Sequence, residues 1–242
     1  MLSLLFPSAC MICGRRVETG AVPVCEDCLS AQARMVYRSH EHGAFERLFW
    51  KSFPVEHATA MYFFHEGHVR EMVHAFKYHQ HPELARALAR RWAEQMEGTD
   101  FFDGVEAIVP LPLHPLRYLK RGYNQSLYLA RGLARATGLP VVEGAVVRRG
   151  KASTQTCLHG LAARQANVEG VFFLKHSDRV AGKHVLLVDD VATTGSTLAS
   201  CARVLSSAPG TRVSIFAFAY AGYVVRMGDV WRIDDDVVNG EW

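Results

Sequence analysis

The sequence predicts an α/β protein in which a parallel sheet is flanked by helices and preceded by a small cysteine-rich module. Three observations lead to this prediction. From residue 58 onward, apolar runs with the length of buried strands alternate with helical patterns. One run, HVLLV at 184–188, is continuously apolar, which is typical of a parallel strand covered on both faces. Four of the six cysteines lie in two close pairs near the N-terminus.

The composition is that of a globular protein. Of the 242 residues, 49% are hydrophobic and 21% are charged, so the chain can bury a core and is not expected to be disordered. The net charge of +3 is too small to indicate a nucleic-acid partner by itself. No run reaches the ~20 apolar residues of a membrane-spanning helix, and the N-terminal MLSLLFPSAC is too short for a signal sequence. We therefore expect a cytoplasmic protein without membrane insertion.

The two cysteine pairs, Cys10-x2-Cys13 and Cys25-x2-Cys28, indicate a zinc site within a module of residues 1–35. Zn²⁺ prefers four ligands in a tetrahedron, with sulfur at about 2.3 Å, and each pair supplies two of them. With every position filled by protein, the site would be structural and would do no chemistry. It would fold a segment too small to fold alone, so we expect Cys13→Ser to unfold this module with little effect on the rest. Redox use of one pair is the alternative.

The next segments are expected in the following order. Residues 36–57 show no clear hydrophobic period, and we expect linker or irregular structure there. AMYFFHEG (60–67) predicts a strand that enters a turn. Residues 68–97 follow helical spacing, with apolar side chains at positions 69, 72, 73 and 76 on one face. Pro82 divides this stretch, and a second helix is expected from there to Glu97.

From residue 104 onward, strand and helix patterns alternate, which predicts one α/β domain from 58 to 222. The final residues, 223–242, hold Asp234, Asp235 and Asp236 and are expected to form an acidic tail. The expected elements are a strand at 105–113, a helix at 124–137 ending at Gly138, apolar runs at 139–147 and 168–174, a strand at 184–188, a helix at 197–207 and a strand at 211–220.

The stretch VLLVDDVATTGST (185–197) carries the most chemical information. A buried strand leads to two carboxylates at the edge where open α/β sheets bind ligands. A turn of small hydroxyl residues then opens a helix, so backbone N–H groups and hydroxyls can hold one phosphate. The carboxylates can accept hydrogen bonds from vicinal ribose hydroxyls or reach Mg²⁺ through water. A strand-to-helix turn with capping threonines and no ligand is the alternative. The residues expected to bind a phosphoribosyl ligand are Asp189 and Asp190, which are also the catalytic candidates, and Ala192, Thr193, Thr194, Gly195, Ser196 and Thr197.

This stretch resembles the phosphoribosyl-diphosphate motif of type I phosphoribosyltransferases. Roughly residues 1–220 resemble the ComF family of competence proteins, which includes GntX-like members. The resemblance covers the paired cysteines and, in the order of the family, HVREMVHAFKYH (68–79), PLPLHPLRYLKRGYNQS (110–126) and TQTCLHGLAARQANVEGVF (154–172). It implies a zinc-finger head joined to a phosphoribosyltransferase-like domain that binds phosphoribosyl diphosphate with Mg²⁺. It also implies a role in natural transformation, in which incoming single-stranded DNA is handled together with DNA-uptake proteins.

Basic residues cluster between 110 and 165, where the one acid is Glu143. In a type I transferase, the loop after the first core strand approaches the pyrophosphate, and a flexible hood follows the next strand. Arginine forks in such segments can clamp phosphate oxygens. The candidates in the loop are Arg121, Gly122, Tyr123, Asn124 and Gln125, and those in the hood are Arg148, Arg149, Thr154, Gln155, Arg164 and Asn167.

Two functions therefore remain open at the level of sequence. The first is an enzyme or former enzyme that binds phosphoribosyl diphosphate with Mg²⁺; many members of the family have no assigned transferase reaction, and no pattern here indicates an acceptor base. The second is a catalytically inactive regulatory protein that keeps the sugar-phosphate pocket for a nucleotide or a DNA strand. The basic stretch, interleaved with tyrosines, suits a single-stranded DNA backbone as well as a diphosphate.

Overall fold

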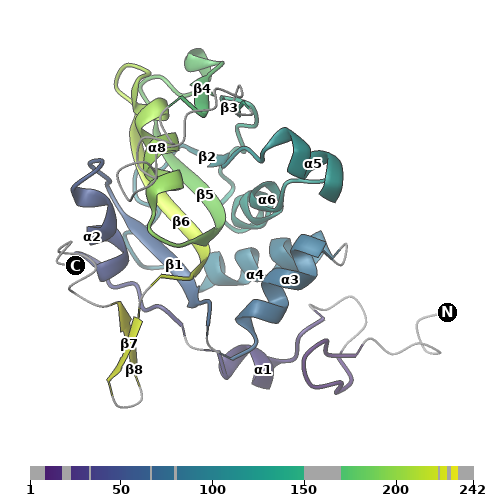
Figure 1. Ribbon diagram of the computed structural model, residues 1–242. Helices are drawn as coiled ribbons and strands as arrows, with labels where there is room; N and C mark the ends of the chain where they lie inside the picture. The colour runs from purple at the N-terminus through teal and green to yellow at the C-terminus, as the bar shows by residue number, and fades with distance from the viewer. Residues whose placement is uncertain are drawn as a thin grey trace, which may run out of the picture.

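The computed structural model describes residues 9–17, 23–32, 34–65, 67–78, 81–149, 170–222, 224–227 and 230–233. At its centre is a four-stranded sheet in the order β1-β6-β5-β2, and every neighbouring pair in it is parallel (Figure 1). The predicted α/β class is thereby confirmed. The four strands are β1 (Ala58–Phe63), β2 (Ala107–Pro110), β5 (His184–Ala192) and β6 (Arg212–Tyr220).

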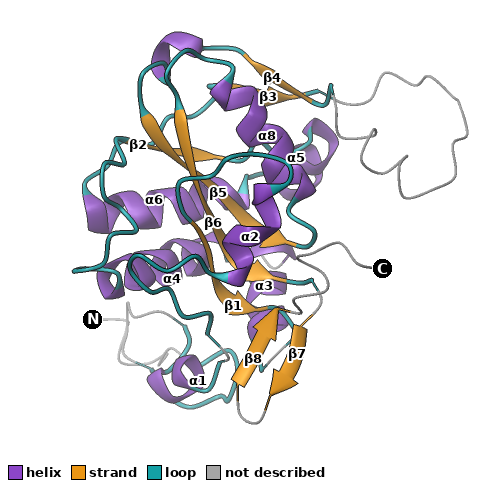
Figure 2. Cartoon of the chain, turned by 90° about the vertical axis from the view of Figure 1, so that its left-hand side faces the viewer, coloured by secondary structure: helices purple, strands orange, loops and turns teal. Residues whose placement is uncertain are grey.

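Helices cover both faces of this sheet (Figure 2). On one face, Leu186 and Val188 of β5 pack in a cluster with three helices, α3, α4 and α6. On the other face, the alternate residues Val185 and Leu187 pack in a cluster with α2 and α8. The helices are α1 (Glu26–Ser30), α2 (Ala44–Trp50), α3 (Val69–Tyr78), α4 (Pro82–Gln95), α5 (Pro115–Arg121), α6 (Gln125–Thr137) and α8 (Ser196–Ser206).

Local sequence signals set the helix boundaries as predicted. Pro82 occupies the first turn of α4, where its missing N–H costs no hydrogen bond. Asn124 caps the start of α6 with its side-chain oxygen, and Gly138 ends that helix in the left-handed conformation. Within α6, Gly132 allows close packing against α4, because a Cβ atom there would lie 2.2 Å from the carbonyl oxygen of Arg86.

Two of the segments that differ from the sequence expectation belong to the core. Residues 36–57, expected to be irregular, contain α2, and Phe45 and Phe49 of this helix are buried in the core. A helix of seven residues is too short to produce a clear hydrophobic period. The strand predicted at 184–188 continues through both aspartates to Ala192, because β6 runs beside it and pairs with it along that length.

Two two-stranded antiparallel sheets complete the described structure. β3 (Val146–Arg148) pairs with β4 (Phe172–Leu174), and β7 (Val224–Met227) pairs with β8 (Val230–Ile233). The sheet of β7 and β8 lies within the expected acidic tail, and Ile233 is buried in the cluster that holds α2. This part of the tail is therefore folded onto the core, whereas residues 234–242, with the three aspartates, lie outside the described residues.

The cysteine-rich head packs directly on the α/β domain. Cys28 and Leu29 belong to the same hydrophobic cluster as α3 and α4. The edge of the sheet is covered here as well, because Arg34 forms an antiparallel bridge with Tyr62 of β1. An ion pair between Glu26 and Arg91 joins α1 to α4. The head thus shares its core with the rest of the chain. Among the described residues, no helix is both long and apolar enough to span a membrane.

Candidate functional site

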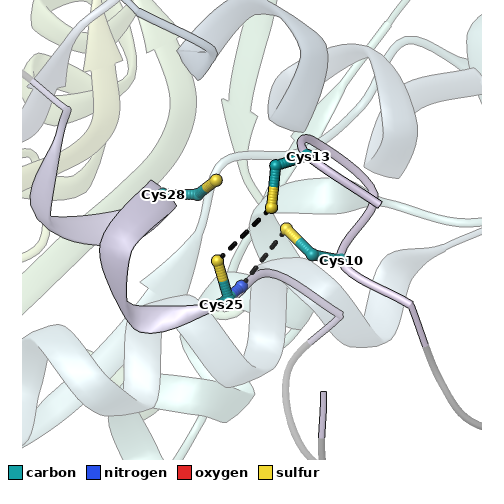
Figure 3. Close-up of side chains that lie close together, drawn as sticks. All are labelled: Cys10, Cys13, Cys25 and Cys28. Atoms are coloured by element: carbon teal, nitrogen blue, oxygen red, sulfur yellow. Dashed lines mark hydrogen bonds between the residues drawn. The ribbon is translucent and has the colours of Figure 1, made fainter. Parts of the chain in front are cut away.

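The four cysteine sulfur atoms of the head all lie within 4.8 Å of one another (Figure 3). A tetrahedral zinc site with Zn–S bonds of about 2.3 Å requires sulfur atoms about 3.8 Å apart, and the Sγ atoms of Cys13 and Cys25 are 3.7 Å apart. The backbone N–H of Cys25 donates to Cys10 Sγ. Arg15 donates to Cys13 Sγ, and this hydrogen bond is the main reason why the pKa of Cys13 falls to about 6. The cluster therefore fits a structural Zn²⁺ held by Cys10, Cys13, Cys25 and Cys28.

A cleft of about 350 Å³ opens at the carboxyl ends of β2 and β5. This is the edge at which open α/β sheets bind ligands. The walls come from segments far apart in the sequence: the end of α3, the residues after β2, α5, the start of α6, β3, the end of β5 and the start of α8. The polar side chains that line it are Asp189, Asp190, Lys77, Arg117, Arg121, Arg148, Gln125, Ser126 and Thr197.

The acidic pair lines the cleft, and each carboxylate has its own partner. Asp189 is 9% exposed and accepts hydrogen bonds from Ser126 Oγ at 3.1 Å and from the backbone N–H of Asp190 at 2.8 Å. Burial, and after it the charge of Asp190, raises the pKa of Asp189 to about 7. Asp190 forms an ion pair with Lys77, with 3.1 Å between Oδ2 and Nζ. Two adjacent carboxylates are thus held at one rim of the sheet.

The hydroxyl-rich turn leads from β5 into α8 as the motif predicts. Gly195 is the N-cap of α8 and has φ of 73°, a conformation that glycine adopts without strain. The turn packs tightly on α2, because a Cβ atom at Gly195 would lie 2.9 Å from the Phe49 ring. Thr193 and Thr194 are exposed, and the Thr194 and Ser196 hydroxyls are 2.8 Å apart. Ala192, by contrast, is buried, so its contribution to a ligand is limited to its backbone.

The predicted pyrophosphate loop divides into residues that line the cleft and residues that shape it. Arg121 and Gln125 line the cleft and are joined by a hydrogen bond of 3.0 Å. Gly122 ends α5 in the left-handed conformation. Asn124 caps α6 and donates to the carbonyl oxygen of Leu111, which fixes the loop against the end of β2.

Of the predicted hood residues, Arg148 lines the cleft. Its guanidinium lies 5.4 Å from the centre of the Phe172 ring, and its Nε is buried without a hydrogen-bond partner among the described residues. Burial, and after it the positive charge of Arg117, lowers the pKa of Arg148. Arg149 is exposed and lies over Phe173. Thr154, Gln155, Arg164 and Asn167 lie outside the described residues.

Sequence reasoning missed three polar residues of the cleft as site residues: Lys77, Ser126 and Arg117. Lys77 lies in the stretch HVREMVHAFKYH, but nothing in the local pattern connects it to the acidic pair 113 residues later. Ser126 follows the cap of α6, where a serine is normally explained by helix capping alone. Only the packing of α3 and α6 against the end of β5 brings these side chains to the carboxylates.

Residues 123–237 match the phosphoribosyl transferase domain. The chain is 35% identical over 139 residues to DNA utilization protein YhgH of Salmonella typhi, and it is 36% identical over 119 residues to Competence protein F of Haemophilus influenzae. These matches cover 55% and 48% of this chain. The chain is thus similar to competence and DNA utilization proteins of the ComF family. The region shared with these two ComF-family relatives covers 59% and 51% of their length.

A solved structure of the allosteric regulatory enzyme of purine biosynthesis matches 60% of this chain and 30% of its own, with a TM-score of 0.41 and 19% identity.

The matched phosphoribosyl transferase domain includes only part of the cleft. Gln125, Ser126, Arg148 and the acidic pair fall inside the matched phosphoribosyl transferase domain, whereas the end of α3 and all of α5 precede it.

Proposed function

We propose that this chain binds phosphoribosyl diphosphate, together with Mg²⁺, in the cleft at the end of β5. The observation that carries the proposal is the arrangement along one strand exit, where the acidic pair and the hydroxyl-rich turn are only a few residues apart. Vicinal ribose hydroxyls donate hydrogen bonds to carboxylates such as Asp189 and Asp190. The N–H groups at the start of α8 and the hydroxyls of Thr194 and Thr197 suit a 5′-phosphate.

The cations of the cleft suit the diphosphate. Arg117, Arg121 and Arg148 line the same cavity as the acidic pair, and arginine binds phosphate oxygens with paired hydrogen bonds. Mg²⁺ prefers hard oxygen ligands and is usually held by a carboxylate or two together with substrate phosphates, and Asp189 and Asp190 offer such oxygens. When bound, Mg²⁺ would offset part of the diphosphate charge. A displacement at C1 of the pentose would rely on this positioning and charge stabilisation rather than on a general base.

Calorimetric titration of the zinc-loaded protein with phosphoribosyl diphosphate and MgCl₂ tests the proposal. We expect saturable binding by the wild type, and a loss of roughly tenfold or more in affinity for Asp190→Ala and for Thr194→Ala, because each removes a polar contact to the ligand. Asp178→Ala, at an exposed acid outside the cleft, is the matched control and should bind like the wild type. Wild-type affinity in both site variants, or no binding by the wild type, would contradict the proposal.

We further propose that this chain takes part in DNA uptake and binds single-stranded DNA beside the same cleft, together with proteins of DNA uptake. Two relatives are named for DNA utilization and competence. Tyr78 and Tyr118 are each 51% exposed and lie on the helices that carry the cleft residues Lys77 and Arg117. Exposed aromatic rings beside cations are the elements with which proteins hold single strands.

Salt dependence separates this second function from the first. Fluorescence anisotropy with a labelled oligonucleotide should show an affinity that falls steeply between 50 and 200 mM salt, about tenfold or more if several phosphates are contacted. Binding of phosphoribosyl diphosphate in the cleft should weaken less, because fewer charges are involved. Tyr118→Ala should reduce DNA binding without affecting the small ligand. If the DNA affinity did not depend on salt, or if no DNA complex formed, the proposal of single-stranded DNA binding would be contradicted, and the proposal for phosphoribosyl diphosphate would be unaffected.

A further inference from the structure

Three successive residues at the end of α3 contact the cleft or the segment between α5 and α6 beside it. The carbonyl oxygen of Phe76 accepts a hydrogen bond of 2.8 Å from the Tyr123 hydroxyl. Lys77 forms the ion pair with Asp190. The Tyr78 hydroxyl accepts a hydrogen bond of 3.2 Å from Arg121, whose guanidinium also lies 5.0 Å from the centre of the Tyr78 ring. The end of α3 thus joins the rim of β5 to the segment between α5 and α6 and forms a wall of the cleft.

Of these three residues, Lys77 is the one whose charged side chain lines the cleft. Its side chain is 17% exposed and that of Asp190 is 13% exposed, so the ion pair is largely shielded from water and stronger than a surface pair. A lysine ammonium has three N–H donors and behaves as a compact charge. Asp190 uses one donor, so Lys77 can stay on the carboxylate while it donates to an anion in the cleft.

The contacts also place Lys77 between two parts of the site. On one side it touches Asp190, which belongs to the proposed ribose contact. On the other side its neighbour Tyr78 holds Arg121, which belongs to the proposed diphosphate contact. With Arg117 and Arg148, the cleft contains more positive than negative side chains, and this excess favours a ligand that carries a second anionic group.

We propose that Lys77 is a specificity-determining residue, whose ammonium group, while held by Asp190, donates to the diphosphate at C1 of the pentose. This inference rests on the proposed function, because it assigns one end of the same ligand. It follows that Lys77 distinguishes phosphoribosyl diphosphate from ribose 5-phosphate, which has only a hydroxyl group at C1. If Lys77 instead served only to hold Asp190, both ligands would depend on it equally, because both offer the same ribose hydroxyls.

The two ligands therefore provide the test. Calorimetric titrations with phosphoribosyl diphosphate and with ribose 5-phosphate, both with MgCl₂, are compared for the wild type, Lys77→Met and Lys77→Arg. Loss of a charge-assisted hydrogen bond should weaken the diphosphate ligand roughly tenfold or more in Lys77→Met, and ribose 5-phosphate by less than about threefold. Lys77→Arg keeps the positive charge and should recover most of the lost affinity. Lys175→Met, which removes a lysine from an exposed position outside the cleft, should resemble the wild type.

Every other outcome contradicts either the role of Lys77 or the proposed function. Equal losses for both ligands in Lys77→Met would reduce Lys77 to a support for Asp190, and unchanged affinities would remove it from the site. In both cases the proposed function would survive, because the wild type still binds. A wild type that binds neither ligand would overturn the proposed function and this inference with it. Thermal unfolding of every variant shows whether an affinity loss reflects a damaged fold, and Lys77→Arg provides a second reading if Lys77→Met unfolds.

Discussion

The cysteine head and the cleft both collect polar side chains that need partners, but they are built from very different lengths of chain. The head takes all four cysteines from residues 10–28, so one turn and the start of α1 create the cluster. The cleft joins residues from 77 to 197, and only the assembled sheet brings them together. In the head, the polar groups converge on one another in a shape that fits a single metal ion. In the cleft, the Asp189 carboxylate and the Nε atom of Arg148 are buried, although burial of charged groups away from water costs free energy.

The two sites are therefore expected to contribute differently to the free energy of unfolding. Metal binding by four thiolates adds its free energy directly to the free energy of unfolding. The cleft contributes in the opposite direction, because burying Asp189 raises its pKa to about 7 and so disfavours the charged form at neutral pH. Changes to the cysteines of the head should therefore lower stability, whereas changes to the acidic pair of the cleft should lower ligand binding with little or no loss of stability.

The largest expected effect is that of Cys13→Ser. Loss of one of four ligands should release the zinc and lower the free energy of unfolding by several kcal/mol, on the order of the contributions of structural zinc sites. Because Cys28 and Leu29 belong to the core of α3 and α4, we expect the whole protein to unfold in one transition at a lower temperature. This revises the expectation that the α/β domain would be little affected. Zinc analysis and scanning calorimetry measure both effects.

Met11→Ser is the matched control for this prediction. Met11 lies in the same turn, between Cys10 and Cys13, and its side chain is not one of the four ligands. It should keep its zinc and lose little stability. A Cys13→Ser protein whose main transition stays at the wild-type temperature would show that the head folds separately from the sheet.

A smaller effect is expected for Gly195→Ala in the hydroxyl-rich turn. The residue has φ of 73°, which costs an alanine about 1 kcal/mol, and the new Cβ would lie 2.9 Å from the buried Phe49 ring. We expect a total loss of about 2–3 kcal/mol, together with weaker ligand binding, because the turn must move. Gly144→Ala is a close control: its φ is 77°, and a Cβ there meets no atom within 4 Å. Equal losses of stability for the two variants would mean that the contact with Phe49 does not constrain the turn.

The surroundings of Gly195 also show what could and what could not be predicted from the sequence. The cysteine cluster and the turn from Asp189 to Thr197 were predictable because each is a local pattern whose spacing fixes its geometry. The role of Lys77 was not, since it depends on α3 crossing to the end of β5. Phe49 was missed for a related reason: seven helical residues carry too weak a period, so the residue beneath Gly195 lay in a segment expected to be irregular.

The expected effect on stability that is opposite in sign, a gain rather than a loss, is that of Asp189→Asn. The pKa of Asp189 is about 7 in the folded protein, where burial is the main cause, against about 3.9 in an unfolded chain. Between these values the folded state holds more protons than the unfolded state, so the free energy of unfolding falls as the pH rises and levels off above about 7. An asparagine has no proton to lose, so this contribution disappears in the variant.

The stability of Asp189→Asn relative to the wild type should therefore rise by roughly 2–3 kcal/mol from pH 5 to pH 8, or roughly 5–10 °C in the unfolding temperature. Ligand binding should be lost in the same variant, because the amide donates where the carboxylate accepts. Asp178→Asn, at an exposed acid, should show no such growing difference. A variant less stable than the wild type at pH 8 would mean that the hydrogen bonds from Ser126 and from the Asp190 backbone outweigh the cost of burial. In that case Asp189, like the cysteines of the head, would support the fold as well as the site.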